Sequence, residues 1–210
     1  MSNKVEQQLT DAQIVIDNAL NNPSIRKQLE SYGYDVKRIK AGKELREKAM
    51  MLHSAQKKEY GVQYGATDAL LAARQEAATL YKKHLTLARM ALPGNRGAWN
   101  TLQLNGARKR NFAGWVSQAR VFYTNVLDIA AELETFGVTQ AELETGQAMI
   151  EAVADARARQ QQGKSKAQQT TRQRNEALQA LNQWMDDFMT VARIALRESP
   201  QELEALGVVM

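Results

Sequence analysis

The sequence has no cysteine, three prolines and two histidines among 210 residues. Without cysteine, disulfide bonds, thiolate metal ligands and thiol nucleophiles are all excluded. Proline is the residue that most often ends a helix, so its scarcity leaves long stretches uninterrupted. Runs of β-branched residues are nearly absent, while Ala, Leu, Gln, Glu, Lys and Arg are abundant. The composition therefore predicts an all-α protein without strands.

Long apolar runs are missing as well. No stretch of about 18 to 20 uncharged apolar residues occurs, and no apolar segment of signal-peptide length follows Met1. The sequence is therefore expected to belong to a soluble, cytoplasmic protein. Hydrophobic residues make up 44% of the chain, which is enough for a substantial core.

The most informative feature is a stretch that recurs after 104 residues: HLTLARMAL at 84–92 matches FMTVARIAL at 188–196. Further matches at the same offset are LESYG at 29–33 with LETFG at 133–137, Gly42 with Gly146, Glu47 with Glu151 and Thr67 with Thr171. We interpret this as a tandem internal duplication, with a first helical repeat at residues 1–104 and a second at 105–210. The two repeats are expected to pack as one structural unit, an elongated antiparallel helical bundle with pseudo-two-fold symmetry.

Each repeat is expected to open with a helical segment. The first covers about residues 9–31 and is interrupted at Asn22 and Pro23, where the asparagine would cap a restart. Its counterpart over about residues 108–135 lacks this interruption and has an amphipathic pattern. Each segment ends after an aromatic residue at a glycine, Gly33 or Gly137, because a helix end often needs a residue with positive φ.

A second and longer helical segment follows in each repeat. Its expected caps are Asp35 in the first repeat and, in the second, Thr139 with Glu142 in a capping-box arrangement. Proline-free spans cover residues 36–92 and 139–197, and one unbroken helix of that size would be about 85 Å long. The middle of the second span, residues 154–177, has no apolar side chain larger than alanine, so it is either a solvated helix or a break.

Glycines in these spans leave two architectures open. Gly61, Gly65 and Gly163 would permit breaks, which would give three helices of about 25 residues in each half. Gln, Arg, Lys and Ala propagate a helix well, and this favours two long helices that pass each other antiparallel. Short tails follow both spans and are expected to fold back and bury their apolar residues. These residues are Trp99, Leu102 and Leu104 in the first repeat, and Leu203, Leu206 and Val208 in the second.

No arrangement of residues typical of catalysis occurs. A di-iron bundle needs Glu-x-x-His pairs, whereas His53 and His84 stand alone and correspond to Arg157 and Phe188 in the other repeat. Gly-rich phosphate loops, nucleophile elbows and dinucleotide fingerprints are also missing. We therefore predict no catalytic, cofactor-binding or metal-binding residue, and we do not expect an enzyme.

Arg89 and Arg193 are the most specific polar signal, because each lies within the repeated apolar stretch. They could form a pair directed at an anion. Alternatively, each guanidinium binds helix-terminal carbonyls or a carboxylate of the other repeat, such as Glu30 or Glu134. We favour the second interpretation and assign structural roles to both arginines, as to the two stop glycines.

Charge is strongly segregated along the chain. Between Glu76 and Asp128 there is no carboxylate. The cations in this basic region are Lys82, Lys83, Arg89, Arg96, Arg108, Lys109, Arg110 and Arg120. Such a region could bind nucleic acid or an acidic membrane surface. Its aromatic residues, however, fall at core spacing and do not alternate with the cations as a stacking platform would need.

The starts of the two long spans carry opposite charges. Lys37, Arg38 and Lys40 stand where the second repeat has Ala141, Glu142 and Glu144. Opposite signs at equivalent positions suggest that these tips associate, within a chain or between chains, although simple solvation of both is as compatible with the pattern.

Three functions follow from these patterns. The expected one is a non-catalytic helical scaffold or protein-interaction module that self-associates through its tips. The alternative is an anion-binding protein that uses the basic region. A bundle that sequesters an apolar ligand comes third, supported only by eight methionines, which are more simply core filler. No cofactor is expected.

Overall fold

The computed structural model describes residues 2–207, with side chains from residue 4 onward, and it contains no strand within this range. The elements in chain order are α1 (Ser2–Asn21), α2 (Pro23–Glu30), α3 (Val36–Ala91), α4 (Arg96–Thr101), α5 (Phe112–Val126), the 3-10 helix η1 (Leu127–Ile129), α6 (Ala130–Glu134), α7 (Gln140–Ala195) and α8 (Pro200–Ala205). The prediction of an all-α protein is confirmed.

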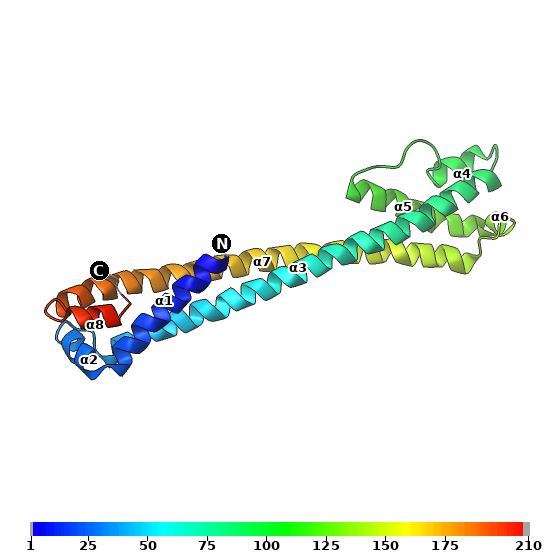
Figure 1. The fold of residues 1–210 in the computed structure, drawn as a ribbon. Coiled ribbons are helices and arrows are strands. Elements are labelled where there is room, and N and C mark those ends of the chain that lie inside the picture. Colours follow the sequence, from blue (N-terminus) through cyan, green and yellow to red (C-terminus); the bar gives the residue numbers. More distant parts are fainter. Residues whose placement is uncertain (1, 208–210) are drawn as a thin grey trace. The chain divides into compact units, whose positions relative to one another are not determined.

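The helices α3 and α7 are each 56 residues long and are not broken (Figure 1). Gly61, Gly65 and Gly163 lie inside them, and the long-helix alternative is the one observed. The polar middle of α7 stays helical because its Gln, Arg, Lys and Ala residues favour a helix without help from a core. The bounds of α7 and α8 equal those of α3 and α4 shifted by 104 residues, as a duplication would produce. The duplication itself stays a prediction.

The chain forms two compact units, and only unit 1 combines segments that are distant in the sequence. Unit 1 contains the chain up to Tyr60 and from Ser165 onward, and unit 2 contains Gly61–Lys164. Both α3 and α7 run through both units, so each unit takes one part of each long helix (Figure 1). These units therefore do not coincide with residues 1–104 and 105–210, the division that the sequence repeat suggests.

In unit 1, α1, α2 and α8 pack against the first part of α3 and the last part of α7 (Figure 1). Its buried residues include Leu9, Ile16, Ile25, Leu29, Tyr34, Ile39, Leu181, Phe188 and Leu206. Phe188 lies at the centre of an aromatic group, with its ring centroid 5.0 Å from the stacked ring of Trp184 and 5.3 Å from Tyr34. Offset-stacked and edge-on pairs at such distances add to the stabilisation from burial.

In unit 2, α4, α5 and α6 pack against the last part of α3 and the first part of α7. Its buried residues include Tyr81, Leu85, Leu102, Leu104, Phe122, Tyr123, Leu133, Leu143 and Ile150. Here Tyr81 contacts both Phe122 and Tyr123, with ring centroids 5.4 and 5.8 Å apart. Each unit thus has its own aromatic core.

The two predicted stop glycines end α2 and α6 with the same backbone geometry. Gly33 has φ 81° and Gly137 has φ 74°. The amide of Tyr34 donates to the carbonyl of Leu29 at 3.0 Å, and the amide of Val138 donates to the carbonyl of Leu133 at 3.2 Å. This is the Schellman pattern, in which a residue with positive φ lets the chain turn back on the last helical carbonyls.

The predicted helix caps are present, although one is only half formed. The Asn22 side chain accepts from the amides of Ser24 and Ile25. Asp35 accepts from the Arg38 amide at 2.7 Å. Thr139 accepts from the Glu142 amide at 3.2 Å, but the Glu142 carboxylate binds Lys83 in place of closing the capping box.

The helix expected over residues 108–135 is shorter and interrupted. It begins at Phe112, where Asn111 accepts from the Gly114 amide, because the segment before it forms a loop held by Arg108. The Arg108 guanidinium donates to the carbonyls of Gln103 and Asn105. Toward its end the helix passes into η1, at the position that corresponds to the Asn22–Pro23 interruption of the first segment.

The tails after the long helices fold back as expected. Leu102, Leu104, Leu203 and Leu206 are buried, whereas Val208 lies outside the described residues. The Trp99 indole donates to the carbonyl of Leu92 at 2.7 Å, which ties the first tail to the end of α3.

Substitutions at positions with positive φ are expected to lower the stability where they replace a glycine and to raise it where they introduce one. Gly33→Ala and Gly137→Ala should each lower the free energy of unfolding by about 1 kcal/mol, because an L-residue is strained there. Gln103 also has positive φ, 50°, where the second repeat has Gly207. Gln103→Gly should therefore raise the free energy of unfolding by about 0.5 kcal/mol. Urea titrations measure both effects. A lower stability of Gln103→Gly would contradict the positive φ of Gln103.

Glycines inside the long helices are expected to fall into two classes. A Cβ at Gly42 would overlap the Trp184 ring, and one at Gly146 would overlap the Tyr123 ring. Alanine at either position should cost about 1–3 kcal/mol. Gly61 and Gly65 have no atom near such a Cβ, so alanine there should stabilise the helix by about 0.5–1 kcal/mol. Thermal unfolding of the four single variants tests this, and a uniform effect would refute it.

Candidate functional site

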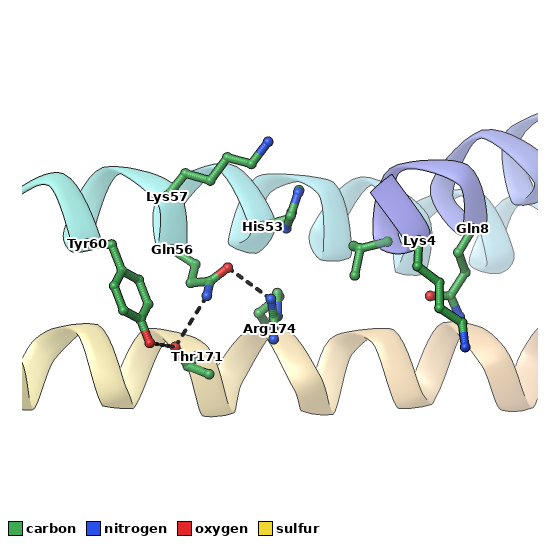
Figure 2. A pocket seen from close by; sticks show the side chains of 9 residues that line it. Lys4, Gln8, His53, Gln56, Lys57, Tyr60, Thr171 and Arg174 are labelled. Atoms are coloured by element: carbon green, nitrogen blue, oxygen red, sulfur yellow. Dashed lines mark hydrogen bonds between the residues drawn. The ribbon is translucent and has the colours of Figure 1, made fainter. Parts of the chain in front are cut away.

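A cavity with polar and apolar walls lies in unit 1, between α1, α3 and α7, and has a volume of about 670 Å³. Lys4 and Val5 line it from α1, His53, Lys57 and Tyr60 from α3, and Arg174 from α7 (Figure 2). We call it the unit 1 groove.

Helical spacing explains why these side chains face one space. On α3, His53, Gln56 and Tyr60 recur every three or four residues and so lie on one face of the helix. Thr171 and Arg174 are three residues apart on α7 and share a face in the same way. The groove forms where these faces meet, beside the start of the described part of α1.

A short set of polar contacts crosses the groove from α3 to α7 (Figure 2). The Arg174 guanidinium donates to the Gln56 side-chain oxygen at 2.9 Å and to Asn175 at 2.6 and 3.1 Å. The side-chain amide of Gln56 and the hydroxyl of Tyr60 each lie 3.5 Å from the Thr171 hydroxyl. Every partner of Arg174 in this set is neutral, so its positive charge is not balanced by a carboxylate there.

His53 is 7% exposed, and neither of its ring nitrogens has a hydrogen-bond partner among the described residues. The nearest carboxylate oxygen, on Glu6, lies 3.8 Å from Nε2, too far for a hydrogen bond. That carboxylate pairs with Lys57 at 2.6 Å. A buried imidazole without partners is uncommon, because each of its nitrogens loses its hydrogen bonds to water and gains none from the protein.

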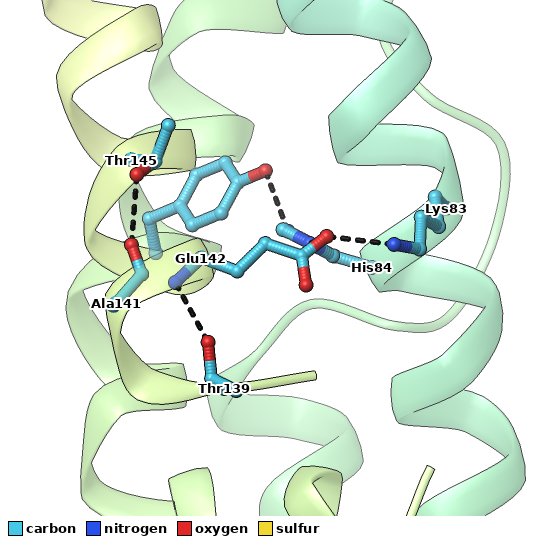
Figure 3. A network of polar contacts seen from close by, with 7 residues as sticks. Lys83, His84, Thr139, Ala141, Glu142 and Thr145 are labelled. Atoms are coloured by element: carbon cyan, nitrogen blue, oxygen red, sulfur yellow. Dashed lines mark hydrogen bonds and ion pairs between the residues drawn. The ribbon is translucent and has the colours of Figure 1, made fainter. Parts of the chain in front are cut away.

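Unit 2 contains a second polar group, which extends from the buried His84 and Tyr123 to the partly exposed Glu142 and Lys83 (Figure 3). His84 is fully buried, and its Nδ1 lies 3.0 Å from the Tyr123 hydroxyl. Its Nε2 faces the Glu142 carboxylate at 3.4 Å, and the same oxygen accepts from Lys83 at 2.6 Å. The contacts fit a neutral imidazole that accepts from the tyrosine and turns its N–H toward Glu142.

The pKa values of this network follow from its burial and its charges. Burial lowers the pKa of His84 below 6.5, because it outweighs the opposing effect of Glu142. The hydrogen bond from Lys83 lowers the pKa of Glu142. Burial raises the pKa of the Tyr123 hydroxyl. All three shifts favour one protonation state at neutral pH, and His84 and Tyr123 are both out of reach of a ligand, so the network is suited to fixing α3, α5 and α7 in register.

The charged residues expected at the tips lie in different units. Lys37, Arg38 and Lys40 are exposed in the first turns of α3, in unit 1. Glu144 is exposed near the start of α7, in unit 2, where it accepts from Gln140 at 2.8 Å. Glu142 is only partly exposed because it belongs to the network with His84.

Half of the cations of the basic region are held by internal partners. Lys83 pairs with Glu142, Arg89 with the Leu104 carbonyl, Arg108 with loop carbonyls and the Tyr81 hydroxyl, and Arg120 with Glu151. The side chains of Lys82, Arg96, Lys109 and Arg110 are exposed and make no hydrogen bond or ion pair within the described residues. The cations of the basic region therefore serve in part to hold neighbouring segments of the fold together.

The two arginines of the repeated stretch have different surroundings. The Arg89 guanidinium donates twice to the Leu104 carbonyl, at 2.7 and 3.1 Å, and so attaches the tail after α4 to α3. Arg193 is exposed and forms no hydrogen bond or ion pair in the described part of the chain. The structure does not bring either of them together with Glu30 or Glu134.

Sequence reasoning missed both the unit 1 groove and the His84 network. Their residues come from three helices, and no spacing along one helix shows which faces will meet. A usable signal for the groove was the mixed character of the α3 face with His53, Gln56 and Tyr60, which is too polar for core and too apolar for a fully solvated surface.

Within residues 4–207 no three His, Asp or Glu side chains are grouped so that they could hold a metal ion. No described helix is both long and apolar enough to cross a membrane. Comparisons with protein-family models, curated proteins and solved structures found no match.

Acid is expected to destabilise the His84 network in two steps. The folded pKa of His84 lies below its ordinary 6.5, so unfolding takes up a proton and stability falls as the pH drops below about 6.5. The folded pKa of Glu142 lies below 4.5, so its contribution is lost only as the pH falls further, below 4.5.

Urea unfolding as a function of pH measures both steps. His84→Gln keeps a neutral side chain that can bond with Tyr123, and it should remove the first step and leave the second. If the stability of His84→Gln runs parallel to that of the wild type between about pH 5 and 7, the first step does not come from His84.

Proposed function

We propose that the chain is a non-catalytic helical scaffold that self-associates through two oppositely charged tips. The basic tip consists of Lys37, Arg38, Lys40 and Lys43 at the start of α3. The acidic tip consists of Glu132, Glu134, Glu142 and Glu144 around the turn between α6 and α7. Because the two surfaces differ, contact between chains joins unlike patches and is heterologous.

The observation that carries this proposal is the sign of the charge at the start of α3. A helix N-terminus carries a partial positive charge, which favours acidic residues there and disfavours cations by about 0.3–1 kcal/mol each. The first turn of α3 has no acidic residue, while Lys37 and Arg38 lie within it and Lys40 follows. None of the four cations of the basic tip forms a salt bridge within the described residues.

Arg38 donates to the Gly33 carbonyl and lies over the Tyr34 ring. The side chains of Lys37, Lys40 and Lys43 make no hydrogen bond or ion pair within the described residues, and this supports a role for them outside the fold. Residues that violate a local rule without a compensating contact concentrate at functional sites. The acidic tip follows the rule, since the first turn of α7 contains Glu142. Its Glu132, Glu134 and Glu144 are exposed and available to a basic partner. The basic tip of a second copy of the chain is such a partner, and it is present at the same concentration.

The alternative, binding of nucleic acid or an acidic membrane surface by the basic region, has less support. Arg108 is occupied by loop carbonyls and Tyr81. Arg96, Lys109 and Arg110 are exposed, but surface cations alone give only weak and unspecific attraction to phosphates.

Sedimentation velocity is expected to detect concentration-dependent association at about 20 mM salt that disappears near 500 mM, because salt screens exposed charges. The variant Lys37→Glu/Lys40→Glu should be monomeric, and so should Glu134→Lys/Glu144→Lys. Their equimolar mixture should associate again, since each then supplies the tip that the other lacks. Glu142 is left intact because of its bond to Lys83.

Matched controls separate a specific contact from a change in net charge. Lys48→Glu/Lys58→Glu changes the charge of α3 equally at exposed positions away from the tip and should associate like the wild type. The variant Lys37→Glu/Lys40→Glu should also melt at a higher temperature than the wild type, since its new charges suit the helix end. A wild-type chain that stays monomeric at low salt, or a mixture that stays monomeric, would refute the proposal.

A further inference from the structure

The unit 1 groove has the size and the walls of a small-molecule site. Pockets that hold small ligands measure about 300–1,000 Å³ and are mostly apolar, with a few polar groups that fix orientation. The groove, at about 670 Å³, falls in this range. Val5, the Tyr60 ring and the aliphatic parts of Lys4 and Arg174 supply apolar surface, since long cationic side chains bury their stems and expose their tips.

The charge at the groove is positive in excess. Three cationic side chains line the groove: Lys4, Lys57 and Arg174. The Glu6 carboxylate pairs with one of them, Lys57, at 2.6 Å. The ammonium of Lys4 and the guanidinium of Arg174 therefore remain without a carboxylate, on α1 and α7, respectively. The planar guanidinium holds N–H groups beyond those bonded to Gln56 and Asn175, in a geometry that suits a carboxylate.

His53 is an independent sign of a ligand. It lines the groove, is 7% exposed, and has two ring nitrogens without a hydrogen-bond partner among the described residues. The other histidine, His84, is also buried, but only its Nε2 lacks a hydrogen-bond partner, because its Nδ1 lies 3.0 Å from the Tyr123 hydroxyl. A ligand with an oxygen acceptor, seated against His53, would supply the partner that the fold leaves out.

We infer that the unit 1 groove binds a small amphiphilic carboxylate, with its head between Lys4, His53 and Arg174 and its apolar chain against Val5 and Tyr60. The charge of the groove selects an anion, its walls select an apolar body, and its volume limits the ligand to small-molecule size. This binding is independent of the contact between the tips, because it involves none of their residues.

Isothermal titration calorimetry of the full chain with decanoate tests the inference. We expect one binding site per chain, weaker binding at higher salt, and at least about tenfold weaker binding of both decanol and inorganic phosphate, which lack the charge and the apolar chain, respectively. Equal affinity for decanoate and decanol, equal affinity for decanoate and phosphate, or no binding of decanoate would overturn it.

Variants locate the site. Arg174→Gln should weaken decanoate binding by about tenfold or more and Lys4→Gln by about threefold, because each removes a charged contact. Arg172→Gln and Lys58→Gln are exposed neighbours on the same helices as Arg174 and Lys57 and should change the affinity by less than about twofold.

Two further measurements separate loss of binding from loss of folding and a small ligand from a protein partner. Lys4 makes no hydrogen bond or ion pair within the described residues, so Lys4→Gln should leave the melting temperature unchanged, and it reports on binding even where loss of the Arg174–Gln56 bond affects folding. Unaltered decanoate affinity in both Lys4→Gln and Arg174→Gln would overturn the inference. Binding of an acidic helical peptide at these residues, with no binding of decanoate, would assign the groove to a protein partner and also overturn it.

Discussion

Each unit depends on an aromatic ring that lies directly on a helical glycine. In unit 1 the Trp184 ring occupies the space where a side chain at Gly42 would be, and in unit 2 the Tyr123 ring does the same at Gly146. A ring that reaches the helix backbone makes contacts over its whole face, and the surrounding aromatic and aliphatic residues pack around it at the density of a crystal. The long helices supply only narrow apolar faces, so these two contacts set how closely α7 approaches α3 in unit 1 and α5 approaches α7 in unit 2.

Most of the local structure could be predicted from the sequence, because its causes are local. The stop at Gly33 follows from the need for positive φ, and the restart at Pro23 follows from the fixed geometry of proline. The division into units could not be predicted. A repeat shows which segments resemble each other, but it carries no information on whether α3 packs mainly with its own repeat or is shared between two cores.

The candidate sites were harder to predict for the same reason. The charges of the tips could be read directly, since exposed charges need no partner to be recognised. Glu142 could not be assigned fully: the local rule predicts a capping box with Thr139, whereas a contact with Lys83 from another helix takes its carboxylate. His53 and Arg174 are far apart in the chain, and only the packing of α3 against α7 brings them to one groove.

The shared long helices impose an order on synthesis. Unit 2 is one continuous stretch, Gly61–Lys164, so all of its residues are translated before the segment of unit 1 that begins at Ser165. The first 60 residues must wait for the segment from Ser165 onward, because translation of the intervening residues 61–164 at about 5–20 residues per second takes roughly 5–20 s. During that interval the apolar faces of α1 and α2 are without their final partners, and this exposes the nascent chain to chaperones and to neighbouring nascent chains on the same message.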